Sequence, residues 1–134
     1  MSPSELVGWT LNNTSAVTAY TSTRIYHGLR PTATTVPCIN YFQLGGATWK
    51  YGLEVATFSV NCRATTAEQA RDIARVVVQT FHGSAGTGLY GTNNSFDVAR
   101  SSLRADQGLI PEPTDSLYNA PVDIQVAYQT SIVS

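Results

Sequence analysis

Few side chains in this sequence are of types that do chemistry, and they form no recognisable catalytic pattern. His27 and His82 are the only histidines. No serine or cysteine lies in a G-x-S-x-G or comparable nucleophile setting. The nearest pair of carboxylates, Glu112 and Asp115, flanks Pro113 in a stretch typical of a solvated loop, which does not favour general acid–base catalysis. The sequence therefore predicts no enzymatic activity, no cofactor and no metal site.

The glycine spacing of one segment, Gly83–Gly88, resembles that of a phosphate-binding loop. Such loops follow a strand and open a helix, so that the N-terminus of the helix faces the anion. This segment instead follows a predicted helix, leads to a predicted strand and contains no lysine. His82 precedes it at the end of that helix, where the helix dipole favours a cation, so we expect a structural role for His82.

Charge is scarce along the chain. The 134 residues, expected to form one domain (1–134), are 13% charged with a formal net charge of −1, and Lys50 is the only lysine. Non-specific nucleic-acid binding requires clustered lysine and arginine, which this sequence lacks. A surface built largely of threonine, serine, asparagine and glutamine is compatible with extensive protein contact, because few charges would have to be desolvated.

The sequence predicts neither a membrane span nor a secretion signal. No apolar run approaches the roughly 20 residues of a transmembrane helix, and residues 1–5 lack the basic start and apolar stretch of a signal peptide. Cys38 and Cys62 lie on neighbouring predicted strands and are expected to be reduced core thiols, since two cysteines alone cannot form a zinc site.

A one-sided helix over Thr66–His82 organises the predicted fold. Thr65 and Thr66 are alternative N-cap residues, each followed three positions later by a glutamate or glutamine, and Gly83 suits the helix end. The apolar side comprises Ala70, Ile73, Ala74, Val77, Val78 and Phe81. A helix with this pattern requires a sheet to pack against.

Alternating residues predict the strands of that sheet. Leu53–Arg63 alternates, with Ala56, Phe58, Val60 and Cys62 on one face, and Val122–Ile132 alternates strictly. Val36–Leu44 and Phe96–Asp106 are further predicted strands, and Gly45-Gly46 is predicted to begin the turn after the former.

The start of the chain predicts smaller elements. Residues 3–12 are predicted to form a short helix, and Ala16–Thr21 is predicted to add a further turn or two of helix. Arg24–Gly28 is predicted to be a brief strand, followed by an extended loop over Leu29–Thr35. The whole order predicts an α+β fold: a mainly antiparallel (mixed) sheet with a long helix packed on one face and a short N-terminal helical segment.

The sequence resembles the tail terminator (tail completion, head-to-tail joining) proteins of long-tailed bacteriophages. The resemblance lies in Arg24–Pro31 (RIYHGLRP), the following Val36–Tyr41 (VPCINY), the strand around Phe58–Cys62 and the helix start Thr66–Arg71, in that order. It covers roughly residues 3–83. The chain departs from the typical pattern at His27, where proline is usual.

This resemblance implies a structural virion protein that caps the head-proximal end of the tail tube. Such proteins commonly form a homo-hexameric ring, contact the tail tube protein and the head–tail connector or stopper, and let viral DNA pass through the lumen without specific binding. Another neck or minor tail protein, and a small ligand-binding or enzymatic α+β domain, are the alternatives.

Two segments are the candidate contact regions: the turn Gly45–Gly52 and the loop Gly83–Phe96, which carries four glycines in its first nine residues and is predicted to be mobile unless a partner orders it. A hairpin tip folded back onto the body is the alternative for the first segment. The candidate contact residues are Trp49, Lys50, Tyr51, Gly86, Gly88, Leu89, Tyr90, Asn93, Asn94 and Phe96.

Overall fold

The structure is a computed structural model that describes residues 3–28, 36–48, 54–82, 91–93, 96–106, 108–112 and 117–130. Three helices and seven strands lie within these ranges. In chain order they are α1 (Pro3–Asn12), α2 (Ser15–Thr21), β1 (Ile25–His27), β2 (Cys38–Thr48), β3 (Glu54–Ala64), α3 (Ala67–Phe81), β4 (Gly91–Asn93), β5 (Phe96–Asp106), β6 (Ile110–Glu112) and β7 (Leu117–Thr130).

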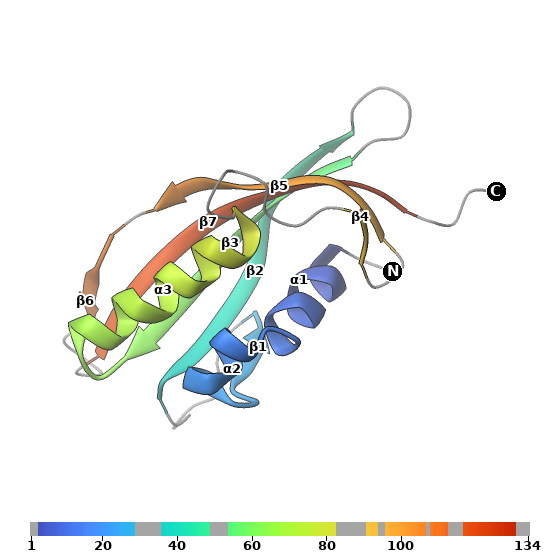
Figure 1. The fold of residues 1–134 in the computed structure, drawn as a ribbon. Coiled ribbons are helices and arrows are strands. Elements are labelled where there is room, and N and C mark those ends of the chain that lie inside the picture. Colours follow the sequence, from blue (N-terminus) through green and yellow to red (C-terminus); the bar gives the residue numbers. More distant parts are fainter. Residues whose placement is uncertain are drawn as a thin grey trace.

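The described strands form a single sheet with helices against one face (Figure 1). The strand order is β1-β2-β3-β7-β5-β4, and β6 pairs with β7 beyond the end of the β5 pairing. The β1–β2 pair is parallel, and every other pair is antiparallel. Helix α3 packs on the central strands β3 and β7, while α1 and α2 lie towards β1 and β2. The predicted α+β fold with a mixed, mainly antiparallel sheet is confirmed.

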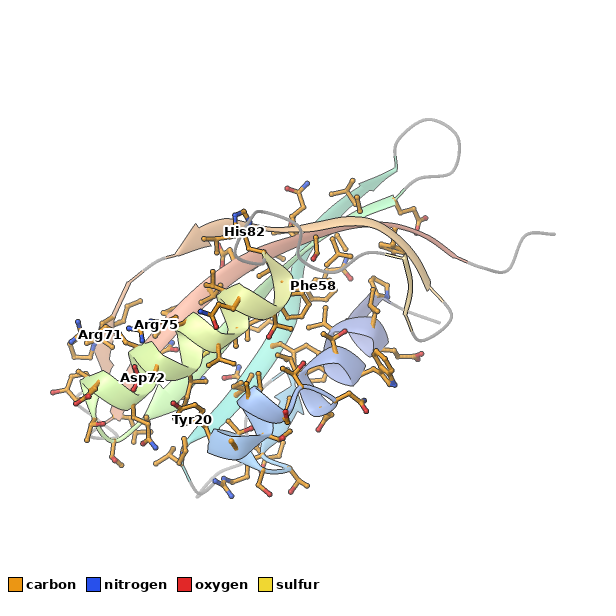
Figure 2. The ribbon with its side chains drawn as sticks, viewed as in Figure 1. Tyr20, Phe58, Arg71, Asp72, Arg75 and His82 are labelled. Carbon is orange, nitrogen blue, oxygen red and sulfur yellow. The ribbon has the colours of Figure 1, made fainter. Side chains whose placement is uncertain are left out.

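Helix α3 begins and packs as its sequence predicts. Of the two possible caps, Thr66 is the one used: its hydroxyl accepts a hydrogen bond from the Gln69 backbone N–H at 3.2 Å. The polar residues Arg71, Asp72 and Arg75 lie on the side of the helix away from the sheet (Figure 2). The side chains buried against the sheet are those of Ala70, Ile73, Ala74, Val77 and Phe81.

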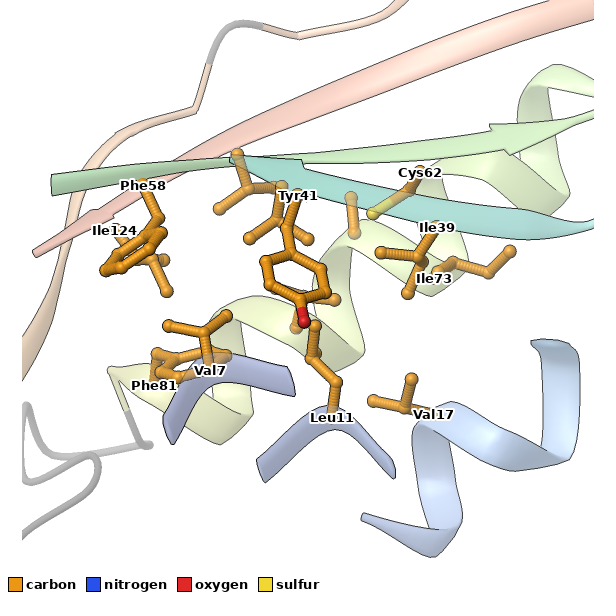
Figure 3. Packing of buried hydrophobic residues seen from close by; sticks show 14 of the residues in the cluster. Val7, Leu11, Val17, Ile39, Tyr41, Phe58, Cys62, Ile73, Phe81 and Ile124 are labelled. Carbon is orange, nitrogen blue, oxygen red and sulfur yellow. The ribbon is translucent and has the colours of Figure 1, made fainter. Parts of the chain in front are cut away.

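The core fills the space between the helices and one face of the sheet (Figure 3). Alternation places Phe58 on β3 and Ile124 on β7 on this inner face, where both are fully buried with Ile73 and Phe81 of α3. Leu11 of α1 and other apolar side chains of α1 and α2 complete the same cluster. The predicted inner faces of the third and last strands are therefore confirmed. Cys38 and Cys62 are buried free thiols, as predicted.

Three predicted element boundaries are wrong. Gly45 and Gly46 do not begin a turn: β2 continues to Thr48, with Gly45 opposite Thr57 and Gly46 opposite Ala56. A Cβ on Gly46 would lie 3.0 Å from the Val55 carbonyl oxygen, so this glycine serves a close approach to β3.

The other two differences also come from strand pairing. Strand β7 begins at Leu117, before the predicted Val122, and includes Pro121, which lies in the gap between the β5 and β6 pairings. Glu112 belongs to β6, opposite Leu117, and not to a loop. The predicted loop Leu29–Thr35 and the predicted helix end at Gly83 lie outside the described residues.

A tight contact joins α1 to β2. The Tyr41 ring extends from β2 towards α1 (Figure 3), and the ring of His27 stacks on it at 5.2 Å between centroids. A Cβ on Gly8 would lie 2.2 Å from the Tyr41 hydroxyl oxygen. Burial raises the pKa of Tyr41. Gly8 is therefore required by packing rather than by backbone conformation.

We predict that Thr66→Ala lowers the free energy of unfolding by about 1 kcal/mol, because the Gln69 N–H loses its cap. Urea unfolding of the purified protein measures the change. The matched control is Thr65→Ala, an adjacent exposed threonine that is not the N-cap residue. Equal losses for the two variants would contradict the assigned cap.

We also predict that Gly8→Ala lowers the free energy of unfolding by about 1–3 kcal/mol, since overpacking outweighs the roughly 1 kcal/mol that alanine gains over glycine in a helix. Gly45→Ala, where a Cβ meets nothing within 4 Å, is the control. Adding Tyr41→Phe to Gly8→Ala removes the clashing oxygen and should restore part of the loss. A Gly8→Ala variant as stable as the parent would refute the close contact.

Candidate protein-interaction site

Most of the candidate contact residues lie outside the described part of the chain. These are Trp49, Lys50, Tyr51, Gly86, Gly88, Leu89, Tyr90 and Asn94. Asn93 and Phe96 are described: they face each other across β4 and β5. Gly91–Asn93 is thus an edge strand, which corrects the prediction of an unbroken mobile loop from Gly83 to Phe96.

The outer part of the β2–β3 hairpin forms an arm, which we define as Phe42–Thr48 with Glu54–Phe58. Its outer end runs beyond the helix layer (Figure 1), while Phe58 at its inner end belongs to the core. Phe42 is 38% exposed and Leu44 is 52% exposed, the two largest apolar side chains of β2 that reach solvent. Neither residue is among those predicted from the sequence to make contacts. The available signal was the absence of any charged residue from Val36 to Thr48.

A buried tyrosine lies where the arm meets β7. Tyr128 is opposite Glu54 in the β3–β7 register and is 4% exposed. Burial raises its pKa to about 12, with further contributions from the hydrogen bond to the Glu54 carboxylate and from the charge of that carboxylate. The neutral hydroxyl thus donates to Glu54 and connects the outer end of the arm to β7.

The sheet face opposite the helices carries polar side chains that bond to one another. Asn40 donates through Nδ2 to the Gly28 carbonyl at 2.9 Å and accepts from the Arg63 guanidinium through Oδ1. Farther across the face, Asn119 Nδ2 donates to Asn61 Oδ1 at 3.1 Å, while the buried Asn119 Oδ1 has no hydrogen-bond partner among the described residues. The charged residues on this face of β3 and β7 are Arg63 and Asp123, and the polar residues between them are buried.

Two hydrogen bonds join the C-terminal end of α3 to β5. Ser101 donates its hydroxyl hydrogen to the Phe81 carbonyl, and the Leu103 backbone N–H donates to His82 Nδ1 at 3.1 Å. His82 therefore has the expected structural role: its Nδ1 accepts the hydrogen bond that joins β5 to the end of α3.

The described residues offer no assembled metal site. No group of three or more histidine, cysteine, aspartate or glutamate side chains comes together within the described ranges. No helix among these residues has the length and apolar character needed to cross a membrane. The surface ion pair between Arg75 and Asp72 spans 3.5 Å on the exposed side of α3, where such pairs contribute little.

We predict that alkaline pH weakens the contact between the outer end of the arm and β7. The folded-state pKa of Tyr128 is raised above the ordinary value of 10.0 to about 12, so its contribution to stability is complete below pH 10 and is lost as the pH rises towards 12. Thermal unfolding between pH 8 and pH 12 measures this loss, and Tyr128→Phe should flatten the curve above pH 10. An identical alkaline slope in the variant would contradict the assignment.

Comparisons with known proteins support the fold. Neither the family models nor the curated proteins compared with this sequence give a match. A chain in a solved structure described as the virion of a native gene transfer agent (GTA) particle superposes with a TM-score of 0.65. The superposition covers 89% of this chain and 88% of that chain, at 12% sequence identity. This chain is thus similar in fold, over nearly its whole length, to a chain of a virion.

Proposed function

We propose that this protein is a structural component of a virion. The observation that carries the proposal is the likeness in fold to a chain of the GTA virion, which extends over nearly the full length of both chains. The order of sequence patterns shared with tail terminator proteins, from the first strand to the start of α3, supports it independently. The sparse charge of the chain, 13% of residues, is in keeping with a protein whose surface meets other proteins.

More specifically, we propose a tail terminator at the head-proximal end of the tail. In this role the protein stops addition of tail tube subunits and presents a surface to the connector. A ring of copies, six by resemblance to the family, closes by rotation through a head-to-tail interface, which turns an open-ended stack into a finished end. A single lysine in the chain suits a lumen through which DNA passes without being held.

Tail length is the measurement that tests the role. Particles assembled without this protein should carry tails longer than normal, because nothing stops the tube from growing. Electron microscopy of such particles gives the length distribution, and supplying the protein in trans should restore a single length.

The other outcomes distinguish the alternatives. Tails of normal length that fail to join heads would favour a neck protein and overturn the terminator role. Normal, infectious particles would contradict a virion function altogether. In that case a ligand-induced shift in melting temperature or catalytic turnover would favour a small ligand-binding or enzymatic domain.

A further inference from the structure

We draw no further inference here: the strongest candidate, the surface patch on the outer part of β2 where Phe42 and Leu44 reach solvent beyond the end of the β1 pairing at Tyr41, carries none because nothing in the described part of the structure shows what covers it.

Discussion

The structure depends on burial between α3 and the inner face of β3 and β7. Ile73, Val77 and Phe81 of the helix are fully inaccessible to solvent, as are Phe58 and Ile124 of the strands. Each such side chain contributes about 1.5–3 kcal/mol by removal from water, which is large beside the 5–15 kcal/mol net stability of a typical domain. This burial therefore holds the long helix on the central strands β3 and β7, and the remaining described strands pair outward from these two.

One consequence is a sheet with two unlike faces. All the described helices lie on the inner face, so the opposite face has no apolar layer to pack against it. Hydrogen bonds among Asn40, Arg63, Asn61 and Asn119 provide partners for polar groups that are largely buried between neighbouring strands. The polar residues of β3 on this second face, Thr57, Ser59 and Asn61, are buried like those on the inner face, so β3 is buried on both sides.

Local sequence patterns predicted the elements whose signal is periodic. Helix α3 and the inner residues of β3 and β7 follow from the periods of 3.6 and 2, because one-sided burial imposes those periods. The Gly45-Gly46 pair was misleading, because glycine pairs usually interrupt strands, and the predicted start of the last strand at Val122 left out Pro121. Their places in β2 and β7 depend on partners distant in sequence: Gly46 approaches the Val55 carbonyl, and Pro121 lies opposite Asn61 in a gap between two other pairings.

The candidate site was less predictable than the fold for the same physical reason. Neutrality of β2 is visible in the sequence, but whether an edge is open depends on which strands stop short of it. The β1 pairing ends at Tyr41, and that follows from the parallel register and not from any residue between Phe42 and Thr48. Likewise, the hydrogen bond from the Leu103 N–H of β5 to His82 could not be predicted from the sequence, because it depends on where the end of α3 meets the sheet.

Charge is distributed unevenly over the described surface. Glu68, Arg71, Asp72 and Arg75 lie on or beside the solvent side of α3, and hydrated charges of both signs there are costly to bury in a contact. On β2, by contrast, no charged residue occurs from Cys38 to Thr48, and Phe42 and Leu44 reach solvent. A protein contact therefore costs less desolvation at the outer part of β2 than at the exposed side of α3.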